Sequence, residues 1–148
     1  MTNLPTTIED CVFWGNRNQN GTSLNAFQIR LYHAPGGAEV LISHSTLELG
    51  LNGIYNFGPG VVTWGPGNLE LDPAFADPDG PDGNPDTVLD NDYRLDATSS
   101  CIDAGDNAPA AGILVDLDGN PRFVDDPNVA DTGSGTAPLI DMGCYERP

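Results

Sequence analysis

An acidic segment runs from Asp77 to Asp92 with the sequence DPDGPDGNPDTVLDND. It holds six aspartates, three prolines and two glycines, and that much proline and glycine excludes a helix. Such a density of carboxylates suits a hard cation, because Ca²⁺ is bound by roughly six to eight oxygen atoms from carboxylates, carbonyls and water. The chemistry that these residue types favour is therefore calcium binding.

Five aspartates of this segment form the predicted calcium site. Three lie on tight proline and glycine turns and two return from the far side of the loop; they are Asp77, Asp79, Asp82, Asp90 and Asp92. The spacing is not that of an EF-hand, which needs a glutamate at its last position. The alternative is a solvated turn in which aspartate caps the backbone. We favour calcium because repulsion among unpaired charges in an ordered loop is costly.

Two other acidic turns are weaker candidates. In DLDGNPRFVDD the acids that could meet are Asp116, Asp118, Asp125 and Asp126, and in CIDAGDN they are Asp103 and Asp106. Both sequences make good turns without an ion, since aspartate and asparagine hydrogen-bond to their own backbone there. We therefore expect turns at both places.

The chain offers little for catalysis. A polysaccharide lyase needs a basic side chain beside a calcium-held uronate, and a glycosidase needs two carboxylates at a fixed separation. The strand-like segments carry single charges only: Arg30, Glu39, Glu48 and Glu70. No nucleophile-elbow, zinc-protease or phosphate-loop motif occurs. We expect no catalytic residues. The alternative is a carbohydrate-binding or lyase-like face, with Trp14, Tyr32, Tyr55 and Trp64 as aromatic candidates.

The elements that would position these residues are short strands. We expect strands within residues 7–16, 26–33, 38–50, 61–64 and 69–71, separated by glycine, asparagine and proline turns. In the second of these, Phe27, Ile29 and Leu31 share one face at the period of a strand. No segment has the apolar period of a helix, so we expect an all-β chain with little or no helix.

Strands this short cannot bury a face alone, and stacking successive turns of chain would solve that problem. Continuous runs of Ile, Val and Leu fit parallel stacking. A β-sandwich is the rival, but Asn20-Gly21 and Asn52-Gly53 are not flanked by the long alternating strands of a hairpin. From about Asp72 onward Asp, Gly and Pro dominate, with enough spaced apolar residues to order the chain. We therefore expect coils over residues 1–76 and an acidic cap over 77–148, packed as one structural domain.

An ordered series of motifs resembles the C-terminal region of bacterial surface and secreted proteins with right-handed parallel β-helix repeats, the choice-of-anchor Q type. The motifs are CVFWGN (11–16), VTWGPGNLELDPAF (62–75), DPDGPDGNPDT (77–87), NDYRL (91–95), SCIDAGDN (100–107), DLDGNPRFVDD (116–126) and IDMGCYE (140–146). Cys144 departs from the small residue usual in the last motif. The resemblance implies a short right-handed parallel β-helix of about three coils with an irregular cap. It also implies export and surface display rather than a named reaction.

The resemblance also bears on partners. Proteins of this type carry many more coils before this ending, and Met1 stands almost directly before the first coil here. We expect that first coil to be covered by upstream coils or by another copy of the chain, since open strand edges invite pairing. A head-to-tail contact of that kind would build filaments. A cell-surface glycan is a further possible partner.

Charge and cysteine content narrow the function classes. The net charge is −17, from 22 acids and five arginines with no lysine. Such a field repels nucleic acids and anionic membranes, so neither is an expected partner. No apolar stretch approaches the length of a membrane span, and no signal peptide is present in this sequence. Two interpretations of the cysteines stay open: a Cys101–Cys144 disulfide with Cys11 free, or three buried, inert thiols.

Overall, the sequence predicts a non-catalytic, extracellular or cell-surface structural module that ends a β-helix. We expect it to be stabilised by Ca²⁺ and to be capable of self-assembly.

Overall fold

The structure is a computed structural model that describes residues 6–17, 27–32, 37, 39–87 and 89–148. The chain divides into two compact units, Met1–Asp72 and Pro73–Pro148, called here the N-terminal and C-terminal units. The division falls four residues before the predicted change at residue 76. The described part of the chain is rich in short strands and contains no α-helix, as predicted.

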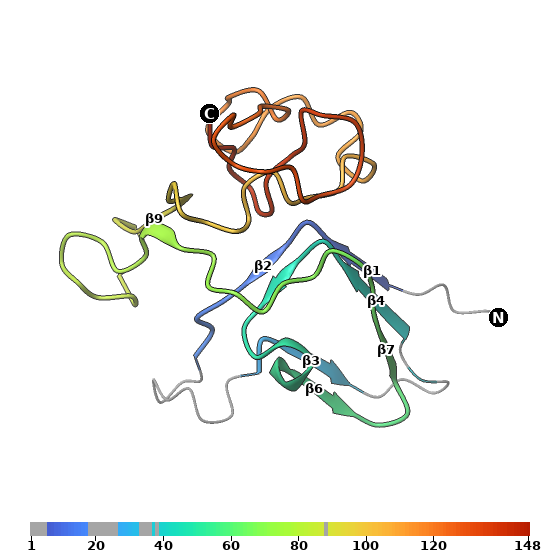
Figure 1. The fold of residues 1–148 in the computed structure, drawn as a ribbon. Helices are drawn as coiled ribbons and strands as arrows, with labels where there is room; N and C mark the ends of the chain where they lie inside the picture. The colour runs from blue at the N-terminus through green and yellow to red at the C-terminus, as the bar shows by residue number, and fades with distance from the viewer. Residues whose placement is uncertain (1–5, 18–26, 33–36, 38, 88) are drawn as a thin grey trace. The chain divides into compact units, whose positions relative to one another are not determined.

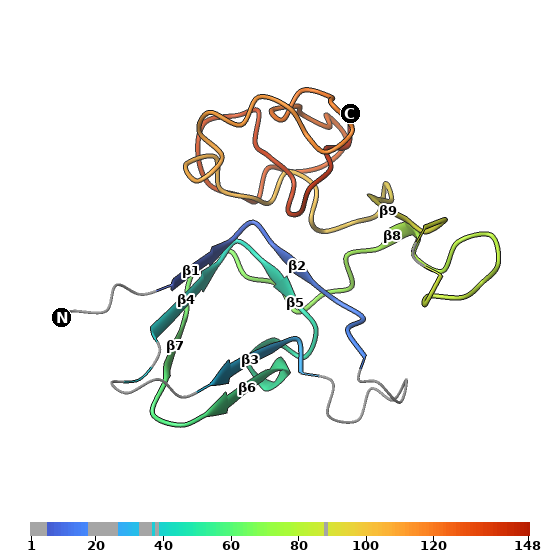
Figure 2. The ribbon, with the colours of Figure 1, turned by 180° about the vertical axis from the view of Figure 1, so that it is seen from behind.

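Parallel strands build the N-terminal unit (Figure 1). The first sheet has the order β1-β4-β7, from Thr6–Glu9, Glu39–Ser43 and Val61–Trp64. The second pairs β2 (Val12–Phe13) with β5 (Thr46–Leu47), and the third pairs β3 (Ile29–Tyr32) with β6 (Ile54–Phe57). A short 3-10 helix, η1 (Gly50–Gly53), precedes β6. Seen from both sides, the sheets surround a shared interior (Figures 1 and 2).

The register of the first sheet places apolar residues of successive strands beside one another. Ile8 pairs with Ile42, and Ile42 pairs with Trp64. The second sheet continues the same order, because Leu69 forms a parallel bridge to Thr46. Ile42 and Leu47 are fully buried, and Val40 nearly so. The interior between the sheets is therefore apolar, as the runs of Val, Ile and Leu predicted.

Two segments predicted as single strands are each broken by a corner. Asp10 (φ 55°) separates β1 from β2, and His44 (φ 43°) separates β4 from β5. A non-glycine residue in the left-handed region turns the chain sharply, so each extended segment contributes to two sheets. Of the remaining strand predictions, β7 matches residues 61–64 and β3 begins at Ile29, later than predicted, whereas residues 69–71 form only an isolated bridge at Leu69.

Polar groups at this corner are satisfied by their neighbours along the stack. The Cys11 backbone N–H donates to Ser45 Oγ at 3.1 Å, and the Ser45 N–H donates to Asn68 Oδ1 at 3.1 Å. Asn68 Nδ2 in turn donates to the Ile42 carbonyl at 2.7 Å. Buried backbone groups need such partners, so these side chains hold the corner where the strands cannot pair.

In the described part of the C-terminal unit, one pair of strands forms. β8 (Phe75–Asp77) and β9 (Asp92–Leu95) pair antiparallel and close the acidic segment at its base. The rest of the unit is turns and irregular chain around a small buried core, formed by Leu95, Cys101, Ile102, Ala104, Ala110, Leu139, Ile140 and Met142. Polar interactions must therefore supply much of its order.

All three cysteines are free thiols. Cys101 is buried, Cys11 is half-buried and Cys144 is exposed, so neither interpretation from the sequence holds in full: no Cys101–Cys144 bond is present, and the thiols are not all buried. Partial desolvation by the surrounding chain raises the pKa of the Cys11 and Cys144 thiols, which keeps both protonated and weakly reactive near neutral pH.

Among the residues that the structure describes, no helix has the length and apolar character needed to cross a membrane.

The buried apolar positions predict a mutational contrast. Leu47→Ala removes a fully buried side chain and is expected to lower the free energy of unfolding by about 2–5 kcal/mol. Leu51→Ala, at a position that is 51% exposed, is expected to change it by less than about 0.5 kcal/mol. Urea denaturation of the two variants checks this. Equal losses in the free energy of unfolding would mean that Leu47 is not part of the apolar interior.

Candidate metal centre

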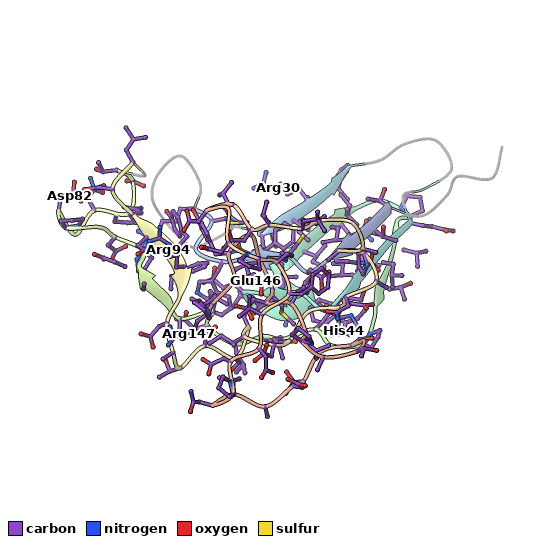
Figure 3. The ribbon with its side chains drawn as sticks, turned by 90° about the horizontal axis from the view of Figure 1, so that it is seen from above. Arg30, His44, Asp82, Arg94, Glu146 and Arg147 are labelled. Atoms are coloured by element: carbon purple, nitrogen blue, oxygen red, sulfur yellow. The ribbon has the colours of Figure 1, made fainter. Side chains whose placement is uncertain are left out.

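The acidic segment is an exposed loop closed by a hairpin. Asp77 and Asp92 are register partners at the base of β8 and β9. Gly80 adopts φ 64° and packs closely against the exit of the loop, since a Cβ there would lie 3.0 Å from the Asp90 carbonyl oxygen. Phe75 and Tyr93 meet edge to face across the hairpin with ring centroids 5.3 Å apart. The loop is thus anchored at its base, with Asp82 at its outer end (Figure 3).

Several oxygens in the loop already have partners. Asp82 Oδ1 accepts the Asn84 N–H at 2.9 Å. Asp92 accepts the Arg94 N–H on one oxygen and forms an ion pair with the Arg94 guanidinium on the other, at 3.2 Å. Among the described residues, no three of the five predicted carboxylates lie within 4.8 Å of one another. Calcium binding by Asp77, Asp79, Asp82, Asp90 and Asp92 therefore stays a prediction.

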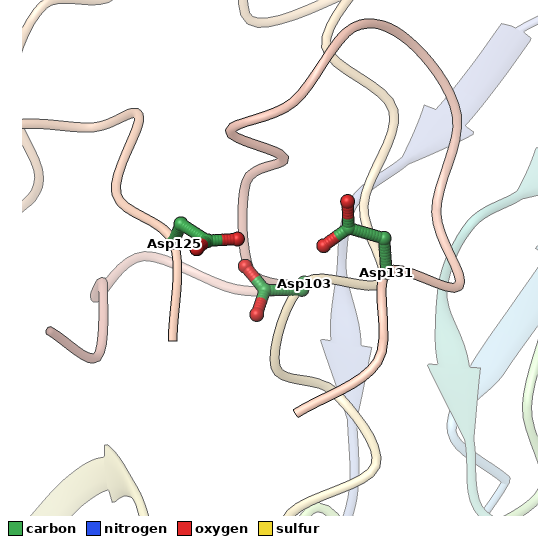
Figure 4. Close-up of side chains that lie close together, drawn as sticks. All are labelled: Asp103, Asp125 and Asp131. Carbon is green, nitrogen blue, oxygen red and sulfur yellow. The ribbon is translucent and has the colours of Figure 1, made fainter. Parts of the chain in front are cut away.

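A different group of carboxylates does come together. Asp103, Asp125 and Asp131 each place one oxygen within 4.8 Å of the others (Figure 4). These three residues are called here the aspartate cluster. They come from three segments of irregular chain, and their carboxylates point toward one another. The cluster offers oxygen ligands only, the type that Ca²⁺ and Mg²⁺ prefer.

The backbone around Asp103 is fixed on all sides. Its N–H donates to Asp141 Oδ1 at 2.8 Å, and its carbonyl accepts the N–H groups of Thr132 and Gly133, both at 3.0 Å. Gly133 lies so close to the Gly105 carbonyl that a Cβ would overlap it. Position 133 therefore requires glycine, because any side chain would collide with the Gly105 carbonyl. This close contact brings the segment that contains Asp131 next to Asp103.

The Asp103 side chain is fully buried, and its two oxygens differ. Oδ2 accepts the Asp126 N–H at 3.3 Å, whereas Oδ1 has no hydrogen-bond partner. Burial raises the pKa of the Asp103 carboxyl, and repulsion from Asp125 and Asp131 raises it further. Asp125 and Asp131 are exposed, so one side of the cluster faces solvent.

The sequence contained only part of this arrangement. Asp103 and Asp125 each belonged to a turn in which an ion was not expected, and Asp131 was not considered. Their separation along the chain follows no metal-binding spacing. The sequence feature that pointed to this cluster was the high number of acids after Asp72. It identifies the acidic half of the chain but not which carboxylates meet.

Of the other weak candidates, Asp106, Asp116 and Asp126 accept backbone N–H groups in turns, as predicted, whereas Asp118 pairs with an arginine. Both carboxylate oxygens of Asp116 accept hydrogen bonds, from the Asn120 N–H at 2.8 Å and from the Glu146 N–H at 3.1 Å. Asp118 forms an ion pair with Arg94 at 2.7 Å. Asp126 Oδ1 accepts the Asn128 N–H, which lowers the pKa of Asp126.

Asp141, which accepts the Asp103 N–H, also contacts a buried ion pair that includes Glu146, labelled in Figure 3. Arg122 Nη1 is 2.7 Å from Glu146 Oε1, and both side chains are almost fully buried. Arg122 Nη2 also donates to the carbonyls of Asp141 and Gly143. Glu146 accepts the Asp141 N–H at 3.2 Å. One buried cation thus compensates a group of acids and carbonyls.

Burial dominates the titration of these acids. It raises the pKa of Glu146 to about 8, aided by repulsion from Asp141 and opposed by Arg122. It likewise raises the pKa of Asp141 to about 6. The folded unit therefore holds protons on these carboxyls at pH values where the unfolded chain does not.

Comparison of the chain with protein-family models, with curated proteins and with solved structures found no match. The resemblance to β-helix proteins therefore remains an expectation that rests on the sequence motifs.

The Glu146 carboxyl predicts a pH dependence. Its folded pKa of about 8 lies above the ordinary value of 4.5, so the folded state binds more protons between these values, and stability falls as pH rises from about 5 to 8. Glu146→Gln is expected to flatten this slope in melting temperature. Glu70→Gln, at an exposed position, is the matched control and is expected to keep it. Calorimetry from pH 5 to 8.5 checks this, and an unchanged slope in Glu146→Gln would contradict it.

Proposed function

We propose that the chain is a structural module, in which the N-terminal unit forms about three successive coils of a parallel β-helix. Support comes from the order of pairing, because each of the three sheets joins residues from successive passes of the chain in parallel. The corners at Asp10 and His44 directly follow Glu9 and Ser43, which are register partners. The C-terminal unit is proposed to act as the cap expected from the sequence, outside the cell.

The observation that carries this proposal is the open edge of β1. In the part of the chain that the structure describes, β1 pairs with β4 alone. Its other edge presents backbone N–H and carbonyl groups to which a further parallel strand could add. Upstream coils or a second copy of the chain would satisfy these groups in the same geometry as β4.

The Glu48 side chain, in the turn after β5, also fits a structural role. Glu48 Oε2 accepts the Gly15 N–H at 3.0 Å and Gln28 Nε2 at 2.7 Å. Asn16 Nδ2 donates to Gln28 Oε1 at 2.7 Å. Through Oε2 this carboxylate therefore joins three segments from two successive passes of the chain, which suits a structural role.

The open edge predicts self-association. The chain is expected to form larger species with rising concentration in sedimentation velocity experiments. Thr7→Pro removes a backbone N–H from β1 and is expected to weaken that association. Thr7→Val keeps the N–H and the shape of the side chain, and should associate as the wild type does. A wild-type chain that stays monomeric at every concentration would contradict self-assembly.

A second candidate function is carbohydrate binding, favoured by a row of aromatic rings: Tyr55 and Phe57 on β6, and Phe27 just before β3. Tyr55 and Phe57 are exposed, and their rings stack at 6.1 Å with an angle of 20° between planes. The Phe27 and Tyr55 ring centroids are 4.8 Å apart, and Phe27 precedes β3 instead of lying within it as predicted. The Arg30 guanidinium lies 5.8 Å from the Phe27 ring. Exposed rings beside a cation suit an acidic sugar.

Tyr55→Ala and Phe57→Ala test this row. Each removes one exposed ring, so binding to acidic polysaccharides on a glycan array is expected to fall while the fold persists. Tyr93→Ala removes an exposed ring of the C-terminal unit and serves as the control. Absence of any glycan binding by the wild type would eliminate this function.

A further inference from the structure

We propose that Asp103, Asp125 and Asp131 form a calcium site in the C-terminal unit (Figure 4). None of the five aspartates in the sequence-predicted site belongs to it. The proposal goes beyond the structural role inferred for the N-terminal unit and does not depend on it, because every residue involved lies after Asp72.

The observation that points to a ligand is the unpartnered oxygen of Asp103. The side chain is 0% exposed, and Oδ1 has no hydrogen-bond partner in the described chain. Buried carboxylate oxygens in folded proteins are paired or bound to metals. The neighbours that Asp125 and Asp131 offer are themselves carboxylates, which repel a negative oxygen instead of satisfying it.

A dication resolves this arrangement better than the alternatives. A water molecule can donate to Oδ1 but leaves three negative charges within 4.8 Å of one another. A proton shared between two carboxylates neutralises one charge of the three. A divalent ion binds an oxygen of each carboxylate and cancels two charges at once. The net charge of −17 also concentrates cations near the surface.

Calcium fits the cluster better than other metals. The cluster contains no histidine or cysteine, so it lacks the ligands that zinc and copper select. Two oxygens bound to one Ca²⁺ at roughly 2.3–2.6 Å lie at most about 5.2 Å apart, which accommodates the separation here. Irregular chain gives no strict octahedron, which Mg²⁺ demands and Ca²⁺ does not. Water would complete the shell from the exposed side of Asp125 and Asp131.

The site would tie three segments together. Asp103 is already held by the N–H groups of Thr132 and Gly133 and by the Asp126 N–H. An ion would add bonds from this fixed residue to the two exposed acids. Because only the folded chain gathers the three carboxylates, calcium binding must raise stability.

The experiment is isothermal titration of the full chain with calcium chloride, together with thermal melting in calcium and in EDTA. The wild type is expected to bind one Ca²⁺ at the cluster with a dissociation constant of about 10⁻⁴–10⁻³ M, the range of extracellular modules, and to melt at higher temperature in calcium. Asp125→Asn and Asp131→Asn are each expected to weaken binding about tenfold or more. Both residues are exposed, so both variants should fold, as circular dichroism would verify.

The control is Asp86→Asn, which removes one exposed charge outside both candidate sites and should bind as the wild type does. Asp79→Asn and Asp82→Asn examine the acidic loop. Loss of binding in these two with retention in Asp125→Asn and Asp131→Asn would overturn the cluster in favour of the loop. An absence of calcium binding by the wild type, or tighter binding of magnesium chloride, would also overturn the proposal. Self-association through β1 is measured separately, so failure of one proposal leaves the other testable.

Discussion

The C-terminal unit is organised around the buried contact between Arg122 and Glu146, whose carboxyl, with a pKa of about 8, holds its proton near neutral pH. The described part of this unit has a single strand pair, so most of its buried backbone groups find no ladder to join. Carboxylates take that place: Asp141 accepts the N–H groups of Asp103 and Arg147, and both lie 2.8 Å away. Burying so many acids is unfavourable unless a cation compensates them. Arg122 supplies that charge from within the core and binds two carbonyls in addition.

The N-terminal unit solves the same problem with backbone pairing. Parallel ladders satisfy its strands, and polar side chains complete the hydrogen bonding between them: Ser45 and Asn68 at the corner, and Glu48 in the turn after β5. Its interior can therefore be apolar, and it needs few acids. The uneven distribution of charge along the chain follows from this difference, because a strand ladder needs no carboxylate acceptors and irregular chain does.

The sequence predicted the elements better than the site. Apolar stretches between turns marked the strands, and Val61–Trp64 was predicted with its exact bounds. The corners were missed because Asp10 and His44 adopt positive φ although neither is glycine. Aspartate and histidine adopt this conformation too rarely for the residue type to predict it. The aspartate cluster was missed for a different reason. Local spacing describes the acidic loop well, but Asp103, Asp125 and Asp131 meet only through the folding of irregular chain, which no period encodes.

The acids of the C-terminal unit thus differ in what satisfies them. Asp116, Asp126 and Asp141 accept backbone N–H groups and are complete within the chain. Asp103 is equally buried, yet its Oδ1 accepts no hydrogen bond, and its carboxylate lies in a cluster with two others. Turn capping explains the aspartates that accept backbone N–H groups. It does not explain Asp103 Oδ1, because a capping carboxylate oxygen accepts a hydrogen bond from an N–H group. The density of aspartate in this half of the chain therefore has two causes, and only the arrangement at Asp103 calls for a partner from outside the polypeptide.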